Sequence, residues 1–506
     1  MAAAQDIANR LPITGALMLA TVMTSLDTTI ANVALPHMQG SFSASQDQMI
    51  WVLTSYIVAA TVATPLSGWL SSHFGRKAIF LASIAGFTIA SMLCGIANSL
   101  AEAVIFRLLQ GACGATMAPL SQATMLDLYP PRQFGPVMAV WSAGIWLGPI
   151  FGPLIGGWLT DNFSWRWVFY INLPVGVLAY AGVVAFMARD RAEKARPFDF
   201  LGFGALGIFI SALQLALDRG PMLDWFDSPE IWAEAAFAAA GLYVFLVRTL
   251  TAQHPFFDRA LVLDRNFVAG NLFGVVLSIV LFSTMALQPP LMQGLMGYTV
   301  FGAGLTMMPR GVGSFLSVLV VGRLIGRVDT RLLLAGGLAL SAVATLQMSH
   351  FSLLMTTTPF VVSGIVQGVG MGLMMVPTTT LALATVSPRL RGEATSVYSL
   401  VRGLGRSVGI SGMEAIFTHQ AAVAHADMAA DVQPSSPVFA AGLAGAGHPM
   451  TAGGLEVLNR EITRQAAMVG YVDVFRLMCL GALSMIPLVL LMRPPRAMTT
   501  PVEDLD

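Results

Sequence analysis

Fourteen mainly apolar stretches constrain the fold of this 506-residue chain more than any other feature. A helix needs about 20 apolar residues to cross a bilayer, and within lipid each segment must satisfy its own backbone polar groups. Only 11% of the residues are charged, against about 25% in soluble domains. We therefore predict an all-α polytopic membrane protein. The predicted spans cover residues 13–36, 48–70, 78–98, 103–126, 135–158, 167–187, 201–218, 231–250, 268–290, 303–322, 332–350, 358–382, 395–418 and 470–492.

The basic residues test this count, because loops that stay in the cytoplasm are enriched in Lys and Arg. With the N-terminus inside, eighteen of the 27 Lys and Arg residues fall in predicted cytoplasmic segments and four in the opposite segments. A missed or additional span would scramble this asymmetry. An even number of spans places both termini in the cytoplasm. The other five basic residues lie within spans or at their ends: Arg107, Arg310, Arg402, Arg406 and Arg476.

Two pairs of short segments repeat weakly along the chain. GWLSSHFGRK (68–77), after the second span, is similar to GRLIGRVDTR (322–331), after the tenth. RLLQGACG (107–114), in the fourth span, is similar to GIVQGVGMG (364–372), in the twelfth. Both pairs link one span to the span eight positions later, which indicates that the chain contains two related halves.

The simplest arrangement of these halves is two six-helix bundles with the substrate path between them. We predict bundles in residues 1–190 and 266–506, linked by two additional transmembrane helices in residues 191–265. The second bundle includes a long external loop, residues 419–469, whose centre is rich in Ala, Gly and Pro. The sequence LEVLNREITRQAAMV near its end has helical spacing. We expect a flexible flap with one amphipathic helix that enters the last span.

Asp27 lies in the first predicted span, in the stretch TSLDTTIANVALP. A carboxylate within a bilayer costs several kcal/mol unless it is paired, hydrated or protonated. One explanation is a hydrogen bond to the hydroxyl of Thr24, Thr28 or Thr29 that fixes helix packing. The other is a proton carrier whose charge must change. Because intramembrane acids are functional by default, we favour the proton carrier.

Arg107 is the predicted partner of Asp27. At a rise of 1.5 Å per residue, Arg107 lies about 6 Å into the fourth span from the outside, and Asp27 about 14 Å from the outer end of the first. Long side chains can therefore bring the two within reach of each other or of a shared water. The alternative is that Arg107 extends to the membrane interface.

Several motifs, taken in order, resemble the major facilitator superfamily, and more narrowly its fourteen-span drug:proton antiporters, the EmrB/QacA group. The motifs are LDTTIANVALP in the first span, GWLSSHFGRK after the second, RLLQGACGA in the fourth and GIWLGPIFGPLIGG in the fifth. The segments WRWVFYINLPVG and LQLALDRG, with the external loop, resemble the EmrB branch most closely. The resemblance implies proton coupling through Asp27 and Arg107, in a transporter of the bacterial inner membrane.

The resemblance also identifies a loop motif after the second span: Gly68, Gly75, Arg76 and Lys77. Ser72 and His73 stand where the family signature usually carries an acidic and a basic residue. A charge relay between this loop and neighbouring helices is therefore not expected.

The fifth span resembles the antiporter motif of the family. Its glycines recur every four residues and give a smooth face on which another helix can approach closely, and its prolines allow the helix to bend. The resemblance implies that this interface opens and closes during alternating access. The residues of the motif are Gly144, Gly148, Pro149, Gly152, Pro153, Gly156 and Gly157.

Six polar residues are candidates for the substrate cavity: Gln214, Gln288, Gln293, Arg402, Arg406 and Glu414. If Arg402 and Arg406 face the cavity, two cations favour anionic or weakly acidic substrates; otherwise they pair with their neighbours. The 29 Met and 29 Phe residues provide a flexible apolar lining that can repack around different shapes.

The expected function is proton-coupled multidrug efflux of amphipathic or hydrophobic toxic compounds by alternating access. No G-x-x-x-x-G-K-[ST] loop occurs and the seven histidines lack metal-ligand spacing, so we expect no enzyme, no cofactor, no metal and no nucleic-acid partner. The expected partners are protons, small amphipathic substrates and the lipid bilayer. The EmrB-like resemblance adds a periplasmic membrane-fusion adaptor, docked on the external loop, and an outer-membrane channel. Alternatives are a dedicated exporter or importer of one metabolite, and a non-transporting receptor or scaffold.

Overall fold

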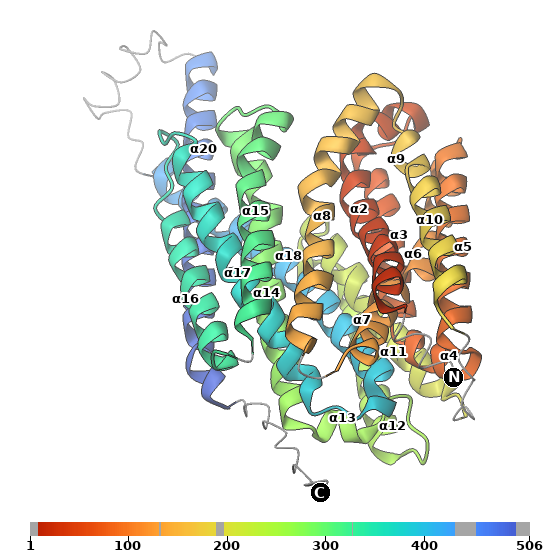
Figure 1. Ribbon diagram of the computed structural model, residues 1–506. Helices are drawn as coiled ribbons and strands as arrows, with labels where there is room; N and C mark the ends of the chain where they lie inside the picture. Colours follow the sequence, from red (N-terminus) through yellow and green to blue (C-terminus); the bar gives the residue numbers. More distant parts are fainter. Residues whose placement is uncertain (1–8, 131–132, 189–196, 326, 431–451, 492–506) are drawn as a thin grey trace, which may run out of the picture.

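In the computed structural model the apolar stretches form α-helices that stand side by side in two bundles (Figure 1). The structure describes residues 9–130, 133–188, 197–325, 327–430 and 452–491. No β-strand occurs in these ranges, as expected where each segment must satisfy its own backbone hydrogen bonds. The predicted all-α membrane fold is therefore confirmed.

The first bundle contains the helices α2 (Arg10–Phe42), α3 (Gln46–Ala63), α4 (Leu66–Phe74), α5 (Arg76–Ile96), α6 (Leu100–Gly114), α7 (Met117–Leu128), α8 (Phe134–Asn162), α9 (Trp167–Tyr170) and α10 (Asn172–Phe186). Two long helices and one short helix follow: α11 (Phe200–Arg219), α12 (Pro229–Thr251) and α13 (Arg259–Leu263). The second bundle contains α14 (Arg265–Pro290), a π-helical turn (Leu291–Leu295), α15 (Val300–Leu324), α16 (Thr330–Met348), α17 (Thr358–Ala384), α18 (Arg391–Ala430) and α20 (Ala452–Met485).

Of the described helices, twelve are long and apolar enough to cross a membrane, or thirteen if the bent pair α3–α4 forms one span. The two helices of that pair meet at 56°, and Pro65 lies at the break, where it interrupts the helical hydrogen bonds. The predicted thirteenth span lies in α18, which is too polar to meet this criterion but packs along α14 and α20. The count of fourteen spans therefore stays a prediction.

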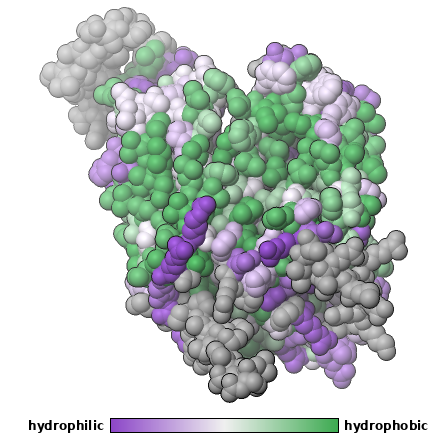
Figure 2. Space-filling model, viewed as in Figure 1, coloured by the Kyte–Doolittle hydropathy of each residue, from purple (hydrophilic) through white to green (hydrophobic). Residues whose placement is uncertain are grey.

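The two ends of the bundles differ in charge. We call the end at which α2 begins and α15 ends the basic end, at the bottom of Figure 1, and the opposite end the far end. Arg76, Lys77, Arg323 and Arg391 lie at the basic end. Between the ends the surface is mainly hydrophobic, and hydrophilic residues gather toward the ends (Figure 2). This band is typical of a protein surrounded by lipid.

The bundles contact each other through α8 with α15 and α17, and through α18 with α4 and α7. At the basic end a Cβ on Gly135 would overlap Ile325, and the hydroxyls of Ser67 and Ser396 lie 2.5 Å apart. One buried apolar cluster also extends from α8 into α15 and α17. The basic end is therefore closed by direct packing of one bundle on the other.

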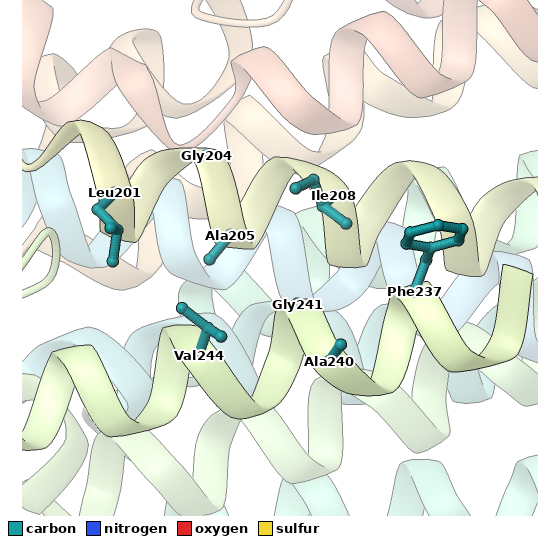
Figure 3. A pocket seen from close by; sticks show the side chains of 8 residues that line it. All are labelled: Leu201, Gly204, Ala205, Ile208, Phe237, Ala240, Gly241 and Val244. Atoms are coloured by element: carbon teal, nitrogen blue, oxygen red, sulfur yellow. The ribbon is translucent and has the colours of Figure 1, made fainter.

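The two linking helices have different surroundings. Helix α12 is mostly uncovered, since only 17% of its most apolar 18-residue stretch is buried. Helix α11, in contrast, contacts α3 of the first bundle and α18 of the second. An apolar groove of about 380 Å³ runs between them (Figure 3). Its lining residues are Leu201, Gly204, Ala205, Ile208, Phe237, Ala240, Gly241 and Val244. This groove lacks polar side chains, so it is a lipid-type surface and not a proton or ion site.

The predicted external loop is shorter than expected, because α18 continues to Ala430 and α20 begins at Ala452. The expected flap is thus wrong at its start, where residues 419–430 are helical. Alanine-rich sequence favours a helix, and α18 and α20 support each other through the hydrogen bond between His425 and Asn459, at 3.1 Å. The helix expected in LEVLNREITRQAAMV is confirmed as the start of α20, and the centre of the predicted flap lies outside the described residues.

The span assignment of α18 can be tested by labelling. In a variant with Cys94, Cys113 and Cys479 replaced by Ala, we expect Asp427→Cys, on the exposed far-end part of α18, to react with a membrane-impermeant maleimide in whole cells. Arg389→Cys, exposed just before α18 at the basic end, should react only after permeabilisation. Labelling of both positions from the same side would show that α18 does not cross the membrane.

Candidate functional site

An ion pair lies in the interior of the first bundle. Nη1 of Arg107, on α6, donates a hydrogen bond to Oδ2 of Asp27, on α2, at 2.8 Å. The two side chains are 1% and 0% exposed. Arg107 therefore does not extend to the membrane interface, and the structure brings together the two residues that the sequence singles out for proton coupling.

Two amides complete the surroundings of the Asp27 carboxylate. Oδ1 accepts hydrogen bonds from Nε2 of Gln110 at 2.8 Å and from Nδ2 of Asn172 at 2.9 Å. Gln110 also accepts from Arg107 at 2.9 Å, so it bridges the acid and the base. Both carboxylate oxygens are thus satisfied, which a buried charge requires. Asn172 was not predicted, although it is a lone amide in the apolar motif WRWVFYINLPVG and begins α10.

The threonines near Asp27 do not bind its carboxylate. The hydroxyls of Thr24 and Thr28 donate to the backbone carbonyls of Thr21 and Ser25, one turn earlier on α2. Thr29 donates to Leu26 of α2 and to Gly148 of α8. The explanation of Asp27 by local hydroxyl hydrogen bonds is therefore wrong.

A second layer of groups orients the ion pair. Ser91 accepts a hydrogen bond from Asn172 at 2.9 Å and donates to the carbonyl of Phe169 at 2.9 Å. The guanidinium of Arg107 lies over the rings of Tyr56, at 4.8 Å, and Phe169, at 5.3 Å. Aromatic faces stabilise a buried cation. When Asp27 is protonated, Arg107 loses its counter-ion, so the charge of this acid is coupled to the positions of α2, α6 and α10.

The antiporter motif on α8 packs against the same turn of α2. A Cβ on Gly148 would overlap the backbone of Ser25, and one on Gly152 would lie 2.9 Å from the Cβ of Thr29. Ser25 also donates a hydrogen bond to the carbonyl of Ile145 at 2.5 Å, and Thr29 donates to Gly148 at 3.0 Å. The expected close helix packing is therefore present, and the partner is α2.

This contact places α8 and the ion pair on different sides of one helix. Ser25 and Thr29 are each two residues from Asp27, which is about 200° around a helix at 3.6 residues per turn. A displacement of α2 therefore shifts both the Asp27–Arg107 ion pair and the contact with α8. The other residues of the motif have fewer close contacts. Gly144 packs on Met18, whereas nothing lies within 4 Å of a Cβ on Gly157. Pro149 and Pro153 lie within α8 without breaking the helix. Gly156 is buried, and its carbonyl accepts a hydrogen bond from Thr160.

The loop motif takes part in an ion-pair network, which the sequence did not predict. Arg76 pairs with Asp127, at the end of α7, at 2.5 Å. The other oxygen of Asp127 pairs with Arg391, the first residue of α18, also at 2.5 Å. Asp127 therefore links the loop of the first bundle to the second bundle. The expectation of no charge relay from this loop is wrong, because the acidic partner comes from α7 and not from the loop itself.

The other residues of the loop motif stabilise the same region, at the basic end of the first bundle. Lys77 donates to the carbonyls of Val184, at 2.9 Å, and Met187, at 2.5 Å, and so satisfies the end of α10. Gly75 has φ +86°, which favours glycine, and forms the tight link between α4 and α5. A Cβ on Gly68 would lie 2.9 Å from Cα of Glu393, so only glycine allows α4 this close to α18.

The candidate cavity residues do not form one cluster. Gln214 donates to Asp218 on α11 at 2.9 Å, and Gln288 accepts a hydrogen bond from Arg310. Gln293 is half-buried in the π-helical turn, and Glu414 is exposed. On α18, the guanidinium of Arg402 lies over Tyr398, at 5.6 Å, and that of Arg406 over Phe282, at 5.5 Å. Both arginines are half-buried, and neither forms an ion pair with a carboxylate among the described residues.

Two packed helical bundles with an ion pair inside one of them are the architecture of a secondary transporter. The chain belongs to the Major Facilitator Superfamily, whose family model matches residues 17–410. The chain is 34% identical to the multidrug export protein EmrB of Haemophilus influenzae over 96% of both chains. It is also 34% identical to the fatty acid resistance protein FarB of Neisseria gonorrhoeae, again over 96% of both chains. The resemblance to the superfamily and to its EmrB branch is therefore confirmed.

Solved structures show the same fold. The human organic anion transporter MFSD10 (TETRAN) superposes with a TM-score of 0.63 over 94% of this chain and 99% of its own, at 14% identity. The proton:xylose symporter XylE superposes with a TM-score of 0.60 over 95% of both chains, also at 14% identity. The chain is thus a multi-pass membrane protein of the major facilitator fold.

The packing of α8 on α2 can be tested by substitution. Gly148→Leu or Gly152→Leu places a bulky side chain against the backbone of α2, and overpacking of this kind costs about 1–3 kcal/mol. We expect transport in vesicles to fall about tenfold or more, with near-normal membrane insertion. Gly336→Leu, on α16 and outside the motif, is the control, because nothing lies within 4 Å of a Cβ at that position. Full transport by both Gly148→Leu and Gly152→Leu would show that this contact is not needed.

Proposed function

We propose that this protein is a proton-coupled exporter of small amphipathic compounds in the bacterial inner membrane, with both termini in the cytoplasm. The observation that carries the proposal is the buried Asp27–Arg107 pair, packed through α2 against the antiporter motif. Membership of the Major Facilitator Superfamily and the similarity to EmrB proteins support export of more than one compound.

The proposed cycle begins with a proton that reaches Asp27 from the far end. Protonation removes the negative charge that balances Arg107. Loss of one partner of a buried ion pair costs about 3–5 kcal/mol, and one proton that crosses the membrane potential supplies about 2.3 kcal/mol per 100 mV. The two quantities are of the same order. A shift of about 3 kcal/mol changes the ratio of two conformations by more than a hundredfold, which is enough to switch the dominant state.

Movement at Asp27 then reaches the interface between the bundles. Because Ser25 and Thr29 hold α8 by hydrogen bonds, α8 follows α2. α8 in turn packs on α15 of the second bundle. In the proposed inward-facing state, the contacts of Asp127 with Arg391 and of Ser67 with Ser396 open at the basic end. Substrate then binds from the cytoplasm, and its binding favours release of the proton from Asp27.

The proposed substrate class rests on the names of the relatives and on two arginines of α18. Names such as multidrug export protein and fatty acid resistance protein point to amphipathic molecules of different shapes. Amphipathic acids form a second candidate class within this proposal, because the half-buried Arg402 and Arg406 lie over aromatic rings without a carboxylate partner among the described residues. A dedicated metabolite transporter or a non-transporting receptor stay as alternatives. A panel of toxic compounds in expressing cells separates broad from dedicated export.

The proton-coupling role is tested by Asp27→Asn. The variant keeps the shape and the hydrogen bonding of Asp27 but cannot change its charge. In vesicles with an imposed pH gradient, we expect binding of substrate to persist and gradient-driven transport to disappear. Asp473→Asn is the matched control, since Asp473 forms a more exposed pair with Arg476 on α20. Wild-type transport by Asp27→Asn along the gradient would overturn the proposal. Absence of substrate-dependent proton release from the purified wild-type protein would favour a receptor or scaffold.

We also propose that the external region between the last two predicted spans, residues 419–469, docks a periplasmic membrane-fusion adaptor that leads to an outer-membrane channel. Within this region the far-end parts of α18 and α20 pack together beyond the predicted spans, which gives a partner a rigid base. Arg460 and Arg464, on α20, are paired with Glu456 and Glu461 of the same helix. Their charges are therefore largely balanced, and shape and hydrogen bonds must contribute most of the recognition.

Replacement of residues 431–451 by a short Gly/Ser linker tests whether an adaptor docks on this external region. The replacement leaves both described helices in place. We expect transport in vesicles to persist and whole-cell resistance to be lost, because substrate released next to the inner membrane re-enters the cell. Unchanged resistance, or an adaptor that co-purifies equally well with the shortened protein, would place the docking surface elsewhere.

A further inference from the structure

A second arginine is buried in the second bundle, without an acid. Arg310, in the middle of α15, is 3% exposed. One of its nitrogens, Nη2, donates to Oε1 of Gln288 on α14. Two others, Nε and Nη1, are buried and have no hydrogen-bond partner. Among the described residues, no carboxylate lies within ion-pair distance of Arg310.

The surroundings of Arg310 are related to those of Asp27 by the internal repeat. In the first bundle Gln110 donates to Asp27, and in the second bundle Gln367 donates to Thr284 at 3.0 Å. Each donor lies 83 residues after its acceptor. Since Gln110 and Gln367 occupy the same place in the repeated motif, Thr284 stands where the first bundle has its titratable acid.

The position of the arginine has also changed between the halves. The repeat aligns Arg107 with Gly364. Arg310 comes instead from the neighbouring helix α15, and its Cβ would lie 3.6 Å from a Cβ on Gly364. A Cβ on Gly368 would overlap the carbonyl of Arg310. The two glycines on α17 therefore make room for an arginine that replaces the missing one, and the second bundle keeps the cation while it lacks the anion.

A buried cation with one neutral partner is costly, because its loss of hydration is not offset by a nearby negative charge. The guanidinium offers five N–H donors and matches carboxylate and halide acceptors. Ser314, one turn further along α15, adds a buried hydroxyl without a partner. Gly311, next to Arg310, packs on Ile150 of α8, so the site adjoins the contact between the bundles.

We propose that Arg310 and Gln288 form an anion-binding site for a small monovalent acceptor, either the carboxylate of an amphipathic substrate or a chloride ion. Gln288 holds the guanidinium in place, and the free nitrogens bind the anion. Asp27 thus changes its charge during the cycle, whereas Arg310 keeps a fixed charge that the ligand neutralises. The carboxylate arm of this proposal rests on the proposed export function; the chloride arm does not.

The probes are 2-naphthoate and its neutral isostere 2-naphthamide, titrated at neutral pH into full-length protein in nanodiscs without added salt. For the wild type we expect naphthoate to bind at least about tenfold more tightly than naphthamide, since a hydrogen bond to a charged group contributes about 1.5–3 kcal/mol. Arg310→Gln should remove this preference and keep naphthamide binding, and Arg310→Lys should retain part of it. Arg323→Gln is the matched control, an exposed arginine near the end of the same helix.

The source of the anion is decided by a second measurement. If chloride occupies the site, addition of sodium chloride raises the unfolding temperature of the wild type and of Arg323→Gln by more than that of Arg310→Gln. The site is wrong if the wild type shows neither naphthoate preference nor stabilisation by chloride, or if Arg310→Gln keeps both; Arg310 then only packs or binds water. If Arg310→Gln fails to fold, the wild type and Arg310→Lys decide the same question. Loss of gradient-driven transport of a neutral substrate in Asp27→Asn reports on the proposed function separately.

Discussion

The buried ion pair between Asp27 and Arg107 is the constraint around which the first bundle is arranged. Two buried charges are tolerated only if their geometry is good and most of the remaining donors and acceptors are satisfied. Gln110 and Asn172 satisfy the carboxylate from two helices, and two aromatic rings cover the guanidinium, whose Nε has no hydrogen-bond partner. The positions of α2, α6 and α10 therefore follow from one carboxylate. A change in its charge changes what holds these helices together.

The same turn of α2 also determines how the first bundle meets α8. Asp27 occupies one side of the helix, and the hydroxyls of Ser25 and Thr29 occupy the other, where they bind carbonyls of the antiporter motif. The glycines of α8 are needed because any side chain at Gly148 would collide with the backbone of α2. The ion pair and the contact between α2 and α8 are thus separated by the width of one helix. No long pathway between them is required.

Sequence patterns predicted the parts of this arrangement that depend on hydropathy. A charge inside an apolar stretch stands out, so Asp27 and Arg107 were found, and their contact followed from depth along the helices. The sequence does not single out Asn172, because one amide at the start of a membrane span can be accommodated in several ways and does not by itself predict a site. The pair of Asp127 and Arg391 joins residues 264 positions apart, and no local pattern reports such a contact. The Ala and His residues in the far-end part of α18 lack apolar periodicity, so the sequence predicts a loop there. Packing on α20 stabilises this part as a helix.

The two bundles solve the problem of buried charge in different ways, and this difference suits a vectorial process. In the first bundle the cation has a titratable partner, so the net charge of the site depends on the proton. In the second bundle Thr284 occupies the place of the acid, and Arg310 retains unpartnered nitrogens. A fixed charge of this kind favours the same ligand in every state, whereas a titratable charge favours different conformations as it changes. In the proposed cycle, energy from a proton gradient enters through the first bundle, and in the proposed anion site the second bundle contributes selectivity between ligands. The internal repeat would give two equivalent sites if both halves had kept the acid, and two such sites would respond to the same proton without distinguishing driver from cargo.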